Sequence, residues 1–222
     1  SLAYHAVLEG EATLVMLAHM LEKSGADFDS LIRQPIFDGL LGSEASADFL
    51  FDKSSPRYFV ESLKFPYLEG LRFVVHAYRK GGWAELNRVY ANPPRSTREI
   101  LHPEDYFERR FEPRVFRATP PLPTVRPLSV EHLGEFHWAF LTGKENAIGW
   151  TADRVTIAQN DLCEPTVLVE TSWQTEAAAQ RFLHAYMRVL DDRGIGFRFS
   201  RDGLDVKLAY GADRTLMETF IP

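Results

Sequence analysis

Two short stretches, RVTIA at 154–158 and TVLVE at 166–170, decide how the second half of this chain is classified. Both are rich in β-branched residues, which pack well on the pleated surface of a sheet. The polar residues 159–165 between them are typical of a turn, so the two stretches predict a β-hairpin. A second hairpin is predicted around Asp202 and Gly203, because that dipeptide favours a tight turn between strands. We therefore expect an antiparallel sheet in this half.

Helical patterns surround these hairpins. Residues 129–142 and 175–192 have apolar side chains at helical spacing, and the second of these stretches is clearly amphipathic. The pattern also admits a last strand at 215–220. The order helix, hairpin, helix, hairpin predicts a small α+β domain in which helices pack on an antiparallel sheet.

The first half of the chain is predicted to be helical. Apolar residues recur at helical spacing, and glycine or proline interrupts them at intervals. Ser96 and Glu99 match a capping box, which marks the start of a further helix. The expected helices cover 2–22, 27–40 (shortened or kinked by Pro35), 43–51, 57–80 (broken by Pro66 and ended by Gly81-Gly82) and 83–90.

A proline-rich stretch separates the two halves. Residues 112–127 contain five prolines and cannot continue a helix or a central strand, so they predict an extended linker. The predicted organisation is therefore a helical region at 1–111, a linker at 112–127 and an α+β domain at 128–222. The fold class is α+β.

Composition excludes several classes of protein. The 222 residues are 45% hydrophobic and 25% charged, which is ordinary for a globular protein. A net charge of -6 makes nucleic acid an unsuitable partner, and the arginines at 109–126 alternate with glutamates and prolines as in a solvated connector. No apolar run is long enough to span a bilayer. The single cysteine, Cys163, excludes an internal disulfide and a cysteine-based metal cluster.

Common catalytic motifs are missing from the sequence. No glycine-rich phosphate loop, G-x-S-x-G or HExxH string occurs. His132 and His137 are five residues apart and do not share a helix face, whereas His5 and Glu9 are four apart and do. Two ligands on one helical turn can begin a metal site but not complete it. A surface hydrogen-bonded pair is the alternative for His5 and Glu9.

One string resembles a known family. AVLEGEAT at 6–13 resembles the EGxA helix of gluzincin-type zinc metallopeptidases, and more narrowly a group of bacterial proteins that carry HExxH upstream of an LVEGDAT-like helix. Further strings similar to that group occur in the same order along the chain: FPYLEG at 65–70, GGW at 81–83, PPRST at 93–97, LHPEDY at 101–106, GEF at 134–136, GWTADR at 149–154 and Trp173 before an alanine-rich helix.

The resemblance implies a role for Glu9. In gluzincins a glutamate from such a helix binds zinc together with the two histidines of HExxH, whose own glutamate activates water. Gly10 would then let a neighbouring backbone approach closely, whereas Glu11 points to another side and is expected to be solvated or hydrogen-bonded. Because HExxH is missing, two ligands and the general base are missing too. We expect zinc in the intact protein and none in this chain alone.

His102 and Tyr67 are the candidate catalytic residues that the resemblance suggests. Such peptidases often use a histidine or a tyrosine to stabilise an oxyanion or contact the substrate. The alternatives are structural: His102 would brace the turn at Pro103, and Tyr67 would pack its ring in the helical core. Trp150 and Trp173 are interpreted as core anchors, and Asp153 as a partner of Arg154 or the cap of a turn.

Two functional hypotheses follow. In the first, the chain is the C-terminal portion of a zinc metallopeptidase acting on a peptide or protein, inactive alone, with an accessory α+β domain. Its start at Ser1, only eight residues before Glu9, favours truncation of an upstream segment. In the second, it is a non-enzymatic interaction module. The resemblance also favours an extracytoplasmic location.

Overall fold

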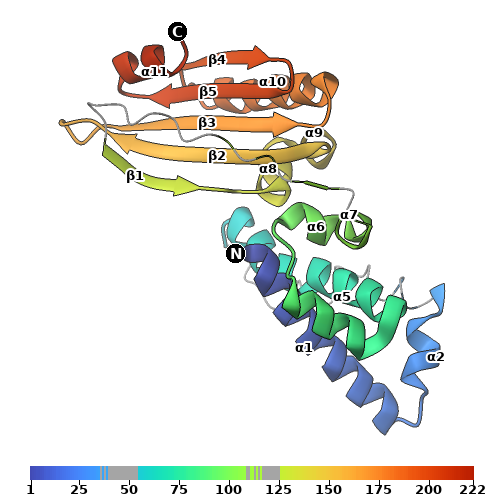
Figure 1. The fold of residues 1–222 in the computed structure, drawn as a ribbon. Helices are drawn as coiled ribbons and strands as arrows, with labels where there is room; N and C mark the ends of the chain where they lie inside the picture. The colour runs from blue at the N-terminus through green and yellow to red at the C-terminus, as the bar shows by residue number, and fades with distance from the viewer. Residues whose placement is uncertain are drawn as a thin grey trace. The chain divides into compact units, whose positions relative to one another are not determined.

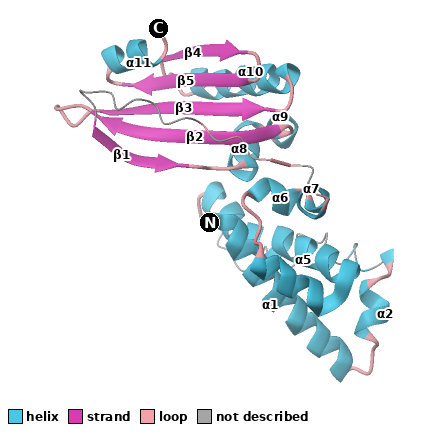
Figure 2. Cartoon of the chain, viewed as in Figure 1, coloured by secondary structure: helices cyan, strands magenta, loops and turns pink. Residues whose placement is uncertain are grey.

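The computed structural model describes residues 1–35, 37, 39, 55–108, 111, 112, 114, 116 and 126–222. It divides into two compact units, Ser1–Arg110 and Phe111–Pro222 (Figure 1). The first is helical, and the second contains an antiparallel sheet with packed helices (Figure 2), which confirms the α+β class. The helix predicted at 43–51 lies outside the described residues.

Helix α1 is the long first helix of the first unit. It spans Leu2–Lys23 and buries one stripe of mostly small residues against α5. The side chains that it buries recur at helical spacing and are those of Ala3, Ala6, Val7, Leu14 and Ala18, together with Gly10. Small residues at a helix interface permit a close crossing, and this crossing positions the candidate site.

Helix α5 spans Arg57–Ala91 and is bent in its second half. Its backbone leaves helical geometry at Gly81 and Gly82, and the φ of Gly82 is +63°, a value that favours glycine. The helix end predicted at this pair is therefore observed as a bend, after which the chain is helical again. The break predicted at Pro66 is wrong, since the helix passes through that residue.

Three short helices complete the described part of the first unit. They are α2 (Phe28–Ile32), α6 (Thr97–Leu101) and α7 (Pro103–Phe107). Helix α2 ends at Ile32 with Arg33 as its C-cap, which agrees with the interruption expected near Pro35. At α6 the Glu99 carboxylate accepts a hydrogen bond from the Ser96 N–H at 3.3 Å, as the predicted capping box requires.

The second unit is built on one five-stranded sheet with the order β1-β2-β3-β5-β4, and all neighbouring strands are antiparallel. Both predicted hairpins are confirmed: β2 pairs with β3, and β4 pairs with β5. The strands are β1 (Arg126–Glu131), β2 (Trp150–Gln159), β3 (Pro165–Trp173), β4 (Phe197–Asp202) and β5 (Asp205–Gly211).

Helices cover the two faces of this sheet. Alternate residues of a strand point to opposite faces. Val169 and Leu208 belong to the core cluster that contains the apolar side of α10 (Glu176–Asp191), whereas Leu168 and Ala209 pack with α11 (Arg214–Phe220). Helices α8 (Glu135–Thr142) and α9 (Lys144–Ala147) contact α10.

Three predictions for the second unit need correction. Residues 129–131 belong to β1 rather than to a helix, because they pair with 155–157 of β2. The same strand includes residues 126 and 127, so the predicted linker extends too far. Residues 215–220 lie in helix α11 rather than a strand, and the Asp213 side chain caps that helix by accepting from the Leu216 N–H at 2.9 Å.

Candidate functional site

Glu9 lies on α1 at the flank of the stripe that faces α5, and its side chain is half-buried. It is therefore held beside a packed helix crossing while part of it stays accessible. Its backbone carbonyl accepts a hydrogen bond from the Thr13 hydroxyl at 2.7 Å, one helical turn further on.

The crossing of α1 and α5 is close at two glycines. A Cβ placed on Gly70 would lie 2.0 Å from the carbonyl oxygen of Ala6, and a Cβ on Gly10 would lie 2.4 Å from the carbonyl oxygen of Gly70. No side chain fits at either position without moving a backbone. The resemblance implied such a close approach at Gly10, and the approaching backbone belongs to the FPYLEG string at 65–70.

Tyr67 comes from that same string, and the Glu9 carboxylate lies close enough to interact with its hydroxyl. Burial raises the pKa of Tyr67, and the nearby Glu9 carboxylate raises this pKa further. The phenol thus stays protonated and remains a donor. The sequence predicted Glu9 as a metal ligand and Tyr67 as a catalytic residue independently, and in the structure the two side chains lie close together.

Glu11 forms a second carboxylate–tyrosine pair between the same two helices. The Tyr90 hydroxyl donates to Glu11, and the resulting contact, together with burial, raises the pKa of Tyr90. The expectation that Glu11 is hydrogen-bonded and turned to another side is confirmed. Glu11 is therefore a natural control for Glu9, because both carboxylates lie beside a tyrosine of α5.

His102 lies at the junction of α6 and α7. Its N–H donates to the Arg98 carbonyl at 2.8 Å, and its carbonyl accepts from the Asp105 N–H at 2.9 Å. These contacts involve the backbone and link the two short helices across Pro103. They agree with the alternative in which His102 braces this turn, and they do not join it to the Glu9–Tyr67 pair.

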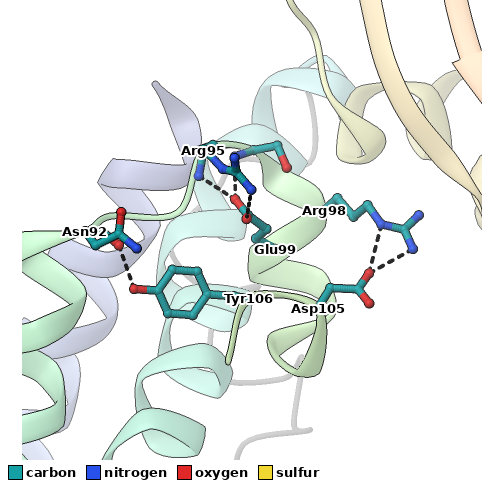
Figure 3. A network of polar contacts seen from close by, with 7 residues as sticks. Asn92, Arg95, Arg98, Glu99, Asp105 and Tyr106 are labelled. Carbon is teal, nitrogen blue, oxygen red and sulfur yellow. Dashed lines mark hydrogen bonds and ion pairs between the residues drawn. The ribbon is translucent and has the colours of Figure 1, made fainter. Parts of the chain in front are cut away.

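Around that junction, α6 and α7 are held by buried charges (Figure 3). The Arg98 guanidinium donates from Nε to Asp105 Oδ2 at 2.9 Å and from Nη2 to the same oxygen at 2.8 Å, and Arg98 is only 6% exposed. A buried arginine needs such a partner, since an unpaired charge away from water is costly.

The loop before α6 joins the same network. Glu99 accepts from the Arg95 N–H at 2.5 Å, and the Tyr106 hydroxyl donates to the Asn92 carbonyl at 2.6 Å (Figure 3). Residues of the strings PPRST and LHPEDY therefore have structural contacts in this network. Sequence analysis missed these pairs, and the buried Arg98 carries no local pattern that would have identified it.

In the second unit, Asp153 is the most enclosed carboxylate, being 1% exposed. It accepts from the N–H groups of Leu133 and Gly134, both at 2.7 Å, and from the indole N–H groups of Trp138 at 2.8 Å and Trp150 at 3.0 Å. Of the two predicted roles, capping a turn is the one observed. Burial raises the pKa of Asp153, and the hydrogen bonds offset part of that rise.

The neighbours of Asp153 also have structural contacts. Arg154 pairs with Glu170 on the next strand rather than with Asp153. His132 Nδ1 lies 2.5 Å from the Asp153 carbonyl oxygen, and His137 Nδ1 contacts the Leu133 carbonyl, so each ring binds a backbone oxygen. Trp150 and Trp173 are buried in the core, as predicted.

Two negative findings apply to the described parts of the chain. Within them, no group of three or more histidine, cysteine, aspartate or glutamate side chains is arranged to hold a metal ion. No helix in those parts is long and apolar enough to cross a membrane.

Comparison with known proteins gives one match. A family model described as a domain of unknown function (DUF8575) matches residues 122–215. The match covers the strands of the sheet and α8 to α10. No curated protein and no solved structure matches the chain. The similarity thus concerns the unit that contains Asp153 and lies downstream of Glu9, Tyr67 and His102.

Proposed function

We propose that the chain is the C-terminal portion of a zinc-dependent metallopeptidase of gluzincin type, to which Glu9 contributes one metal ligand. The observation that carries this proposal is the half-buried carboxylate of Glu9, which lies beside Tyr67 at a glycine crossing. Metal-binding carboxylates are commonly oriented by an outer hydrogen bond, and Tyr67 is placed to supply one. The metal is proposed to be zinc because the string at 6–13 resembles the EGxA helix of gluzincin-type zinc metallopeptidases.

The residues of this chain do not by themselves fit a zinc ion. A catalytic zinc site needs three protein ligands, and the described residues contain no group of three or more histidine, cysteine, aspartate or glutamate side chains that could hold a metal ion. The proposal therefore requires an HExxH helix from outside these 222 residues. This chain alone is expected to be inactive and to bind zinc no better than other acidic surfaces.

Tyr67 is the better of the two proposed catalytic residues. It lies beside Glu9 and is 48% exposed, so its ring can also meet a peptide substrate. His102 is proposed only as a substrate contact of the intact protein, since its observed contacts hold the α6–α7 junction.

Zinc stoichiometry tests the ligand assignment. A longer version of the protein that contains HExxH is expected to hold one zinc ion, and Glu9→Ala is expected to lose it. Glu11→Ala is the matched control, because it also removes a carboxylate beside a tyrosine of α5. The assignment fails if the longer protein holds no zinc, or if Glu9→Ala retains it.

The second candidate is a non-enzymatic interaction module. Large apolar side chains exposed along α1 favour it, because such surfaces commonly bind other proteins. The two candidates differ in whether a longer version of the protein binds and cleaves a peptide in a zinc-dependent manner.

A further inference from the structure

The sheet face that carries α11 is apolar at one end and polar at the other. Leu168 and Ala209 pack with α11 at the apolar end. Because alternate residues of a strand point to the same face, Glu170 and Ser172 of β3 lie on this face as well. They are 8% and 0% exposed, so the polar end is also shielded from water.

Two rows of side chains make up this polar end. In the first row, Arg154 of β2 is opposite Glu170 of β3 and donates to it from Nε at 2.7 Å. In the second row, Ser172 of β3 is opposite Asp205 of β5, and the Ser172 hydroxyl donates to Asp205 Oδ1 at 2.6 Å. The first row thus presents a guanidinium group, and the second presents a carboxylate with a hydroxyl beside it.

Arg114 and Phe116 lie on these two rows. Arg114 Nη1 donates to Ser172 Oγ at 3.0 Å and to Asp205 Oδ1 at 2.6 Å. The guanidinium carbon of Arg154 lies 6.0 Å from the centre of the Phe116 ring, a distance at which a cation is attracted to an aromatic face. Residues two apart on an extended segment point the same way, so one short segment reaches both rows. We call Arg114 and Phe116 the docked pair.

From these contacts we infer that the polar end of this face is a binding site for an extended peptide with an arginine two residues before a phenylalanine. The docked pair occupies the site from within the same chain. The carboxylate and hydroxyl of the second row select the arginine, and the guanidinium of the first row selects the aromatic ring. A peptide with the same pattern from another protein is then the partner that the site fits, and the docked pair is its competitor.

The docked pair is held weakly enough to be displaced. The Arg114 side chain is 53% exposed and that of Asp205 is 36% exposed, and ion pairs so open to water contribute little net stability. Ordering the backbone of the segment costs conformational entropy, which offsets much of what the contacts contribute. The receiving residues lie within the matched domain at 122–215, whereas the docked pair precedes it. The surface and its occupant therefore belong to different parts of the chain.

The inference gives the interaction-module candidate a partner of defined chemistry and does not rest on the metal assignment of Glu9. The probe is a synthetic peptide, EPRVFR, which copies residues 112–117. NMR titration of the full isotope-labelled chain measures its affinity. The double variant Arg114→Ala/Phe116→Ala should bind the peptide roughly fivefold more tightly than the unchanged protein, because its site is no longer partly occupied.

Matched changes test which contacts matter. The same peptide with alanine in place of its arginine should not bind the double variant detectably, and adding Asp205→Asn to that variant should also remove binding. Adding Arg198→Ala instead removes another exposed ion pair, to Glu218, and should change the affinity by less than about twofold.

Three results would overturn the inference. They are equal affinity of the unchanged protein and the double variant, no binding of EPRVFR to the double variant, and equal binding of the two peptides. The second and third need no further change in the protein, so they hold even if Asp205→Asn disturbs folding. Zinc binding is measured separately, so the metal and peptide proposals fail separately.

Discussion

Glu9 in α1 and Asp153 in β2 are both carboxylates at packed parts of the chain, yet they differ in how their oxygens are satisfied. Asp153 is 1% exposed and accepts four hydrogen bonds from two backbone and two indole N–H groups. Glu9 is half-buried, and the side chain shown to interact with it is that of Tyr67. A carboxylate can accept about four hydrogen bonds.

This difference separates a structural role from a candidate binding role. The acceptor capacity of Asp153 is used entirely to fix the turn before α8 and two core indoles. Glu9 is only partly buried and lies beside Tyr67. The site on α1 is therefore the one that can take a further ligand, and each prediction below tests one side of this contrast.

The largest effect is expected at Asp153. Asp153→Ala would leave four buried N–H groups without an acceptor, and we expect it to lower the free energy of unfolding of the second unit by about 4 kcal/mol. Asp153→Asn should cost less, because its amide oxygen can still accept the three bonds now made to Oδ2. Urea unfolding followed by tryptophan fluorescence measures both, since Trp138, Trp150 and Trp173 lie in this unit. A loss below about 1 kcal/mol for Asp153→Ala would contradict the structural role.

A smaller loss is expected at the glycine crossing. Gly70→Ala places a Cβ 2.0 Å from the Ala6 carbonyl oxygen, so α1 and α5 must separate. We expect this change to lower the stability of the first unit by about 2 kcal/mol. Thermal unfolding followed by circular dichroism measures it. Gly196→Ala, where a Cβ meets nothing within 4 Å, is the control and should change stability by less than about 0.5 kcal/mol. Equal effects of the two variants would show that the crossing is not close.

The smallest effect is a change in the titration of Tyr67. Burial is the main cause of its raised pKa, and the nearby Glu9 carboxylate adds to it. Glu9→Gln should therefore lower the pKa of Tyr67 only part of the way to its usual value. Because the folded pKa lies above the unfolded one, the contribution of Tyr67 to stability is present below about pH 10 and is lost at higher pH.

NMR titration of isotope-labelled tyrosine measures this pKa, with Tyr67→Phe to assign the signal. Glu11→Gln is the matched control and should lower the pKa of Tyr90 while leaving that of Tyr67 in place. If Glu9→Gln leaves the Tyr67 titration unchanged, the two side chains do not interact in solution.

The parts of the fold that sequence predicted are those governed by local rules. The hairpin at Asp202-Gly203, the interruption of helical geometry at Gly81-Gly82 and the amphipathic helix α10 each depend on residues close together in the chain. Strand β1 was missed because the sequence of residues 129–131 is compatible with either a helix or a strand. Only the pairing of these residues with β2 shows that they form a strand. Pro66 failed as a helix breaker because tertiary packing retained the helix around it.

The candidate site was predictable in its residues but not in its contacts. Glu9 and Tyr67 were each nominated from a string, and their 58-residue separation in the sequence gives no sign that they meet. The four donors to Asp153 come from residues 133, 134, 138 and 150, which a turn and a helix separate. Such clusters depend on tertiary packing and leave no periodic signal.

The zinc affinity of paired variants tests the central contrast most directly. In a longer version of the protein that contains HExxH, Glu9→Gln should weaken zinc binding by more than about a hundredfold, because it removes a ligand rather than an outer contact. Glu11→Gln and Asp153→Asn should leave the affinity within about threefold of the unchanged protein. Equal zinc affinity in Glu9→Gln and Glu11→Gln would contradict the assignment of Glu9 as the carboxylate that is open to a ligand.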